Sequence, residues 1–162
     1  MDSVAAVLLL LNDSTEGFGQ VPHWDFDKHF LFKIGLAALA GLLIGLEREY
    51  KNKDAGLKTN MLVSIGACAF VLLSLQFHGQ DDTDLSRVLS QVVTGIGFLG
   101  AGVILKEGGS VKGLTTAATV WCSAAAGCIA AFYLITELLS LTGFVVIVNI
   151  IFGVVDSKVS SN

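Results

Sequence analysis

The sequence has little charge. Only 15% of its 162 residues are Asp, Glu, Lys or Arg, whereas 53% are hydrophobic. Soluble domains carry about 25% charged residues, so the shortage argues against a water-soluble globule. The mean hydropathy of +0.72 agrees with this. Proline is almost absent, with one residue, while glycine occurs 18 times. Glycine is commoner in transmembrane helices than in soluble ones, so the composition favours a protein of the lipid bilayer.

Several kinds of site lack the residues that would build them. The three cysteines lie in apolar runs, with no CxxC and no Cys/His ligand spacing. We interpret them as small buried hydrophobes, with a metal or disulfide role as the less favoured alternative. No HExxH motif or catalytic carboxylate pair is found, and Ser, His and Asp are scattered. The sequence therefore predicts a protein that is not an enzyme, with no metal, no cofactor and no nucleic-acid partner.

Five apolar runs approach the length of about 20 residues that a membrane-spanning helix needs. They are residues 29–46, 59–77, 87–105, 114–132 and 134–155. The sequence thus predicts an all-α integral membrane protein, a bundle of about five transmembrane helices. A shorter run at 4–11 predicts a short N-terminal apolar helix. We expect three parts: an outer segment (1–28), the transmembrane domain (29–156) and a cytoplasmic tail (157–162).

The basic residues are shared unevenly between the two sides of this bundle. Of the 10 Lys and Arg residues, three (Lys28, Lys33 and Arg87) fall on one side and the others on the side of the 47–58 connection. The positive-inside rule then places the N-terminus outside and the C-terminus in the cytoplasm. Histidines and acids gather on the outer side, which we interpret as a solvated rim rather than a weak Mg²⁺ surface.

Glycines are concentrated in two of the predicted spans. They are Gly41 and Gly45 in the first, and Gly95, Gly97, Gly100 and Gly102 in the third. Small faces let helix backbones approach closely, whereas a broken helix around a cavity is the alternative. We favour close packing and expect the third and fourth spans to lie nearly backbone to backbone. The GxGxxG match at 95–100 lies inside an apolar run, so a dinucleotide site is not expected.

Polar side chains gather at the inner ends of three spans. They are Glu47 and Arg48 in the first, Thr59 and Asn60 in the second, and Lys112, Thr115 and Thr116 at the fourth. An unpaired polar group in lipid costs several kcal/mol, so such groups face the bundle interior. The cluster either anchors and bonds the helices or forms a site for an ion, a headgroup or a partner protein. A second polar face, with Arg87, Gln91 and Thr94, lies toward the outer side of the third span.

Four segments occur in a recognisable order. They are GLLIGLERE (41–49), AGLKTNMLVSIGA (55–67), VVTGIGFLGAGVILKEG (92–108) and VKGLTTAATVWCSAAAG (111–127). Together they resemble the membrane domain of the MgtC/SapB family. The resemblance implies a bacterial inner-membrane protein linked to growth at low Mg²⁺, intracellular survival of pathogens and inhibition of the F-type ATP synthase. It draws attention to the motif positions Glu47, Arg48, Arg87, Lys112, Thr115 and Thr116.

The chain departs from the family at a few of these positions. The family usually has Arg-Thr-His where this chain has Lys58-Thr59-Asn60, and arginine where Lys112 stands. We hypothesise a non-enzymatic regulator that contacts the F-type ATP synthase, another membrane protein or a second copy of itself, as a dimer. The alternative is a small ion channel or transporter with a polar path through the second to fourth spans.

Overall fold

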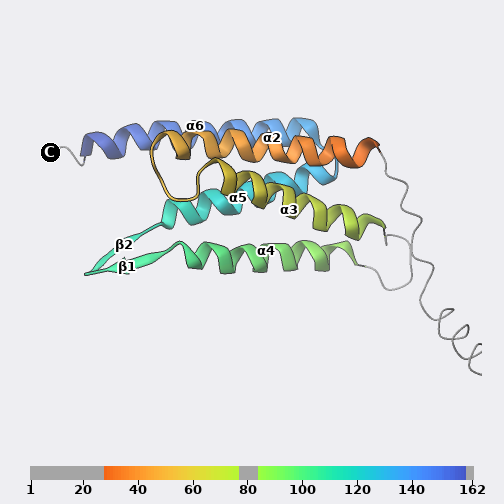
Figure 1. Cartoon of the computed structure of the whole chain (residues 1–162), viewed down its shortest axis with the longest axis horizontal. Coiled ribbons are helices and arrows are strands. Elements are labelled where there is room, and N and C mark those ends of the chain that lie inside the picture. The colour runs from red at the N-terminus through yellow and green to blue at the C-terminus, as the bar shows by residue number, and fades with distance from the viewer. Residues whose placement is uncertain (1–27, 77–83, 160–162) are drawn as a thin grey trace, which may run out of the picture.

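The structure, a computed structural model, describes residues 28–76 and 84–159, with side chains from 29 to 76 and from 84 to 153. Five helices lie along one long axis of these residues (Figure 1). They are α2 (Lys28–Tyr50), α3 (Leu57–Gln76), α4 (Leu85–Gly102), α5 (Leu114–Ala131) and α6 (Ile135–Val159). The predicted all-α membrane bundle is confirmed. The predicted helix at 4–11 and the rest of segment 1–27 lie outside the described residues.

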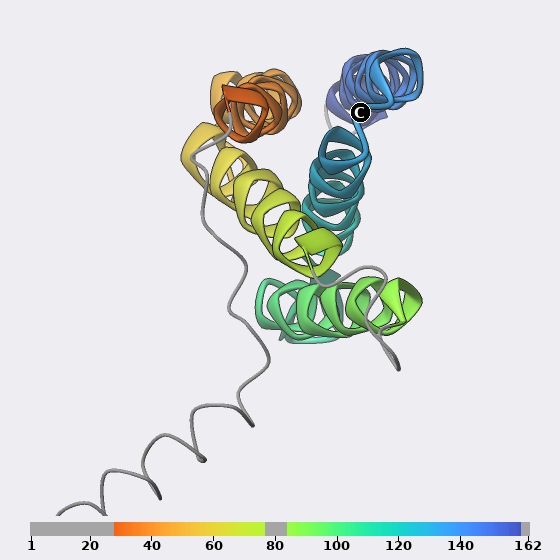
Figure 2. The same ribbon diagram turned by 90° about the vertical axis from the view of Figure 1, so that its right-hand side faces the viewer.

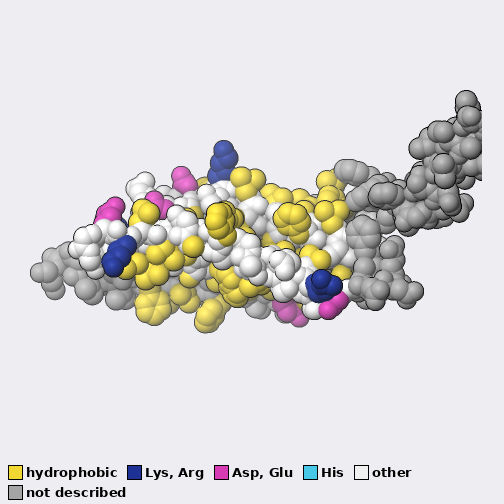
Figure 3. All heavy atoms as spheres, turned by 90° about the horizontal axis from the view of Figure 1, so that it is seen from below, with side chains coloured by type: hydrophobic (Ala, Val, Ile, Leu, Met, Phe, Trp, Pro, Cys, Tyr) yellow, Lys and Arg dark blue, Asp and Glu magenta, His cyan; other side chains and the backbone are white. Residues whose placement is uncertain are grey.

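Four of these helices, α2, α3, α5 and α6, are long and apolar enough to cross a membrane. The helix α4 falls outside this group, because Arg87, Gln91 and four glycines lower the hydropathy of its 18 residues. Large hydrophobic side chains such as Phe70, Phe98 and Phe144 point outward from the bundle. Figure 3 shows hydrophobic side chains spread along one face. Such an exposed apolar surface is what a lipid environment requires.

The structure moves two of the predicted helix ends. The first helix continues to Tyr50, so the connection is shorter than the predicted 47–58 loop. Lys51 N donates to Glu47 O at 3.1 Å, and the two side chains form an i, i+4 ion pair at 2.7 Å. These contacts keep the charged residues helical. At the other end, α6 runs to Val159, beyond the predicted tail boundary at 156.

A short β-hairpin connects α4 to α5, where the sequence predicted only a turn. Its strands β1 (Leu105–Glu107) and β2 (Ser110–Lys112) are antiparallel. The two residues between them, Gly108 and Gly109, have φ of 52° and 96°. A two-residue turn with both φ values positive suits a right-twisted hairpin, and glycine adopts it without strain. The third apolar run therefore ends as a helix at Gly102, before residue 105.

A side chain fixes the start of α4. The carboxylate of Asp84 accepts a hydrogen bond from Ser86 N at 2.8 Å, which caps the helix. The hydrogen bonds to Ser86 hold the pKa of Asp84 below its usual value. The capping group is thus the charged form, which also suits the positive end of the helix dipole.

The helix α5 lies at the centre and contacts α2, α3, α4 and α6. Figure 2 shows α4 on the opposite side of the bundle from α2 and α6. The core holds many small side chains, among them Ala37, Ala40, Ala126, Ala130 and Ala131. In lipid there is no hydrophobic driving force between helices, so they associate through close packing. Small residues at the interfaces allow it because they let the backbones approach.

Three glycines lie where helices touch backbone to backbone. A Cβ added at Gly41 would lie 2.5 Å from Asn60 O and 2.8 Å from Met61 Cα. A Cβ at Gly45 would lie 2.8 Å from Leu57 Cα. At Gly127 of α5 the added Cβ would overlap the carbonyl oxygen of Ser64. The predicted GxxxG pair of α2 thus faces α3, and α3 meets α5 in the same way.

The glycines of α4 do not pack in this manner. A Cβ added at Gly95, Gly97 or Gly102 would meet no atom of the described chain within 4 Å. At Gly100 it would lie 3.6 Å from Ala117 Cβ, an ordinary contact. The expectation that these glycines bring the third and fourth spans backbone to backbone is therefore wrong within a single chain. Gly95, Gly97 and Gly102 are exposed, whereas Gly100 is buried against α5 in an ordinary contact.

Candidate functional site

A buried arginine joins two helices at the end of the bundle that carries the 51–56 connection, which we call the inner end. Arg48, in the last turn of α2, is only 4% exposed. Its Nη2 donates a hydrogen bond of 2.6 Å to Oγ1 of Thr116, in the first turn of α5. Thr116 is likewise buried. Two residues that the sequence assigned to one cluster are therefore brought together.

A second polar contact lies between α3 and α5. Asn60 is fully buried, and its Nδ2 donates to Ala55 O at 2.5 Å and to Gly56 O at 2.9 Å. Its Oδ1 accepts a hydrogen bond of 2.8 Å from Oγ of Ser123. Asn60 thereby hydrogen-bonds the two carbonyl groups that precede α3 and links that helix to α5. The predicted Asn60 belongs to the cluster, and the close approach at Gly127, four residues beyond Ser123, allows it.

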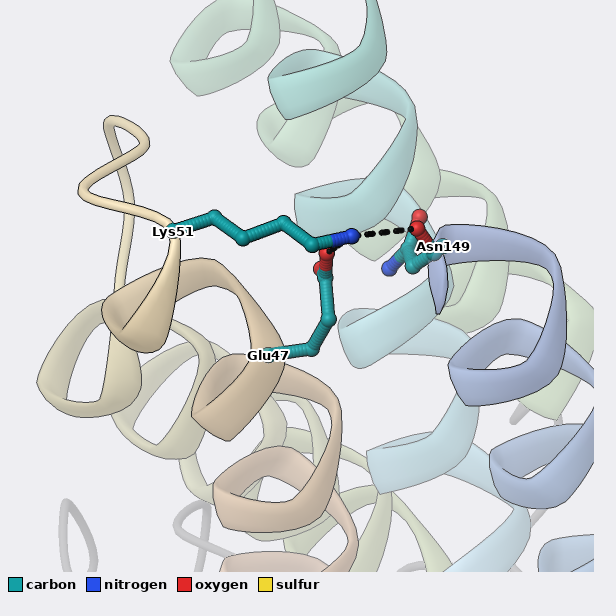
Figure 4. A network of polar contacts seen from close by, with 3 residues as sticks. All are labelled: Glu47, Lys51 and Asn149. Carbon is teal, nitrogen blue, oxygen red and sulfur yellow. Dashed lines mark hydrogen bonds and ion pairs between the residues drawn. The ribbon is translucent and has the colours of Figure 1, made fainter. Parts of the chain in front are cut away.

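A third contact joins α2 to α6. The side chain of Glu47 is 8% exposed and pairs with Lys51 at 2.7 Å. Lys51 Nζ also donates to Asn149 O of α6 at 3.3 Å, as Figure 4 shows. A Cβ added at Gly153 would overlap Lys51 Nζ, so the missing side chain leaves room for the ammonium group. The cluster predicted from the sequence contains Glu47 but neither Lys51 nor Asn149.

Several buried polar atoms of this region have no partner within the described part of the chain. They are Glu47 Oε2, Arg48 Nε, Ser64 Oγ, Thr142 Oγ1 and Asn149 Nδ2. Buried polar groups are normally hydrogen-bonded, so we expect each of these atoms to bind water or a ligand. Four helices contribute to the region, and its polar groups extend from the inner end toward the bundle centre.

Three predicted members of the cluster lie apart from it. The side chains of Thr59 and Thr115 are exposed, one residue away from the buried Asn60 and Thr116. Lys112 is in the hairpin, where it forms an exposed ion pair of 2.7 Å with Glu107. Neighbouring helix residues point about 100° apart, so adjacent residues can differ in burial, as Thr59 and Asn60 do.

The predicted outer polar group, Arg87, Gln91 and Thr94, is exposed along α4. Thr94 Oγ1 donates back to Ser90 O at 2.8 Å. Of the three, only Gln91 lines an apolar groove of about 530 Å³ between α3 and α4. The groove is lined by Leu62, Gly66 and Phe70 from α3 and by Gly95 and Leu99 from α4, among others.

The groups at the inner end can bind a ligand through hydrogen bonds. Arg48 and the hydroxyl and amide groups around it donate and accept hydrogen bonds. Within residues 28–76 and 84–159, no cluster of three or more His, Cys, Asp or Glu side chains could hold a metal ion. We therefore call the set Glu47, Arg48, Asn60, Thr116 and Ser123 the inner polar cluster.

Comparison with known proteins gives one consistent result. The model of the "MgtC family" matches residues 34–158. "Protein MgtC" of Brucella abortus is 50% identical over 113 residues, which are 70% of this chain and 47% of that protein. "Protein MgtC" of Salmonella typhimurium is 42% identical over 122 residues, or 75% of this chain and 52% of that protein. The chain thus spans about half the length of these relatives. No solved structure matches it.

Proposed function

Because the chain belongs to the MgtC family, we propose that it is a non-enzymatic regulator in the bacterial inner membrane. It acts on membrane energetics or ion homeostasis through contacts with other membrane helices. Its N-terminus is outside and its C-terminus is in the cytoplasm, which follows from the distribution of basic residues. Adaptation to low Mg²⁺ and survival inside host cells are the settings that the resemblance of the four motifs implies.

The observation that carries this proposal is the uncovered surface of α4. Gly100 is its only buried residue, and Phe98 is 81% exposed. Beside it, the groove of about 530 Å³ is almost entirely apolar. A helix with glycines on an open face can be approached closely by another membrane helix. We propose the F-type ATP synthase as the partner, with another membrane protein or a second copy of this chain as alternatives.

Reconstitution with purified F-type ATP synthase tests the proposal. ATP-driven proton pumping is measured in vesicles containing the enzyme with the wild-type chain, with Gly95→Leu or with Gly143→Leu. Gly95 lines the groove, whereas Gly143 on α6 has no atom within 4 Å of an added Cβ. We expect the wild type and Gly143→Leu to lower pumping and Gly95→Leu to lose the effect. Equal pumping with and without the wild-type chain would remove the ATP synthase as partner.

A second candidate function rests on the buried polar atoms without partners. Ser64 Oγ and Thr142 Oγ1 lie inside the bundle, deeper than Glu47 and Arg48. Intramembrane polar residues commonly mark ion or proton pathways. A small channel or transporter would carry ions along this polar seam. Flux of Mg²⁺, K⁺ and H⁺ into liposomes tests it, and flux no greater than in empty vesicles would exclude it.

A further inference from the structure

Arg48 is a buried cation, and its described contacts include no carboxylate. Its one side-chain hydrogen bond goes to the neutral hydroxyl of Thr116, and its Nε has no partner. Glu47 and Asp54 act on its charge from nearby, but Glu47 is ion-paired with Lys51, and neither acid forms an ion pair with Arg48 among the described residues. A guanidinium is always charged, and burying it without a directly paired carboxylate is unfavourable. The charge of Arg48 therefore favours an anion that comes from outside the described chain.

The start of α5 presents further donors beside this arginine. The first backbone hydrogen bond of the helix runs from Ala117 N to Gly113 O at 2.9 Å, so the three amides before Ala117 have no acceptor within the helix. Gly113 has φ of 87° and provides no side-chain cap, and the first turn contains no acidic residue. No side chain of the first turn therefore compensates the positive end of the helix dipole. Arg48 donates to the third residue of this helix, so the cation and the amides lie at the same end.

The same end of the molecule is open to the surroundings. Leu114 is 58% exposed, and Thr115 is exposed as well. The exposed cations Lys53 and Lys58 lie in or beside the 51–56 connection, at this end of the bundle. Arginine forks and helix N-termini are the two groups that proteins most often use to bind phosphate. Basic residues near the cytoplasmic surface also attract anionic lipid.

We propose that the inner end of α2 and α5 binds a phosphate-type oxyanion through Arg48 and the first-turn amides of α5. The oxyanion is either the headgroup of an anionic phospholipid or a soluble phosphate compound. The inference names a ligand for the inner polar cluster and so rests on that cluster being the functional site. Anion binding is measured on the chain without ATP synthase. A chain that does not inhibit ATP synthase could therefore still bind the anion, and a chain that does not bind the anion could still inhibit ATP synthase.

The experiment has two arms. In the first, the detergent-purified chain is titrated with phosphatidylglycerol and with phosphatidylcholine, and bound lipid is counted by native mass spectrometry. In the second, inorganic phosphate is titrated and followed by ³¹P NMR. For whichever probe the wild-type chain binds, we expect Arg48→Gln to weaken binding by about tenfold, since a charged hydrogen-bonding partner is lost. Arg87→Gln makes the same change at an exposed position on α4, away from Arg48, and is expected to change binding less than about twofold.

Two milder variants keep the test valid if Arg48→Gln fails to fold, as judged by gel filtration and thermal unfolding. Arg48→Lys keeps the charge but loses the planar fork, and Thr116→Val removes the hydroxyl that orients the guanidinium. Both are expected to weaken binding while Arg87→Gln does not. A response to phosphatidylglycerol alone assigns the site to a lipid headgroup, and a response to phosphate assigns it to a soluble anion. Binding of neither probe by the wild type, or equal binding by all folded variants, overturns the proposal.

Discussion

Two sets of helix glycines meet very different surroundings in this bundle. Gly41, Gly45 and Gly127 lie against the backbone of α3, with no room for one more carbon atom. Gly95, Gly97 and Gly102 of α4 have no atom of the described chain near the place where a Cβ would be. Both sets read alike in the sequence, as small residues in apolar runs. The first set holds the chain together, and the second is available to something outside it.

The packed glycines and the open glycines of α4 differ in the side chains that they bring together. Close approach of α2, α3 and α5 lets buried polar groups from different helices reach one another, as in the Arg48–Thr116 and Asn60–Ser123 hydrogen bonds. Such bonds between membrane helices contribute about 0.6 kcal/mol each on average, so shape complementarity carries much of the stability. The groove beside α4 is lined by apolar residues apart from Gln91. It therefore suits a partner helix better than an intramolecular contact.

The largest expected effect is at Gly127. An alanine there would overlap the backbone of Ser64, which cannot move without shifting α3. We expect Gly127→Ala to lower the free energy of unfolding by about 3 kcal/mol, the upper range for overpacking. Unfolding in mixed micelles titrated with SDS measures the change. Gly143→Ala is the matched control, since its added methyl meets nothing, and equal stability of the two variants would contradict the packed interface.

A smaller loss is expected at Gly41. Its added Cβ would lie 2.9 Å from the Ser64 side chain and close to the backbone at Asn60 and Met61. Because its closest contact, 2.5 Å to Asn60 O, is a milder clash than the overlap at Gly127, we expect Gly41→Ala to cost about 2 kcal/mol. The same SDS titration applies. A loss greater than that of Gly127→Ala would mean that α2, not α5, is the helix held most rigidly against α3.

The sequence alone predicts the helices well, because a long apolar run in lipid must satisfy its backbone hydrogen bonds within the segment, which a helix does. It does not predict the ends of the runs. The charged segment from Glu47 to Tyr50 remains helical, supported by the ion pair of Glu47 with Lys51 just beyond the helix. The three-residue strands around Gly108 and Gly109 are too short to show a periodic pattern. The burial of a glycine is also hidden, since it depends on the rotation of a neighbouring helix.

The inner polar cluster shows the same limit. Sequence position predicts Glu47, Arg48, Asn60 and Thr116 at one depth, and in the structure Arg48 bonds Thr116 while Asn60 bonds Ser123. It does not tell which of two adjacent residues faces inward, so Thr59 and Thr115 were included although both are exposed. The rotation of each helix is set by packing of the whole bundle. Asn149, a lone polar residue in an apolar run, is the signal that could have indicated α6.

A third prediction concerns the hydrogen bond between α3 and α5. Ser123→Ala removes the donor to Asn60 Oδ1, and the buried amide oxygen is left without a partner. We expect a loss of about 1 kcal/mol, because the desolvation of that oxygen is no longer compensated. Thermal unfolding in detergent checks it, with Ser140→Ala as control, since Ser140 is exposed and bonds only its own helix. No difference between the two would show that water replaces the lost donor.

The smallest effect, and the one of opposite sign, is expected on α4. Gly97 is exposed and helical, with nothing within 4 Å of an added Cβ. Alanine has a higher helix propensity than glycine, so Gly97→Ala should stabilise the isolated chain by about 0.5–1 kcal/mol. The SDS titration measures this on the same scale as Gly127→Ala. If the open face of α4 is a docking surface, the same substitution should weaken binding of a partner helix even as it stabilises the chain. Destabilisation of the purified monomer would instead mean that α4 is packed within the chain after all.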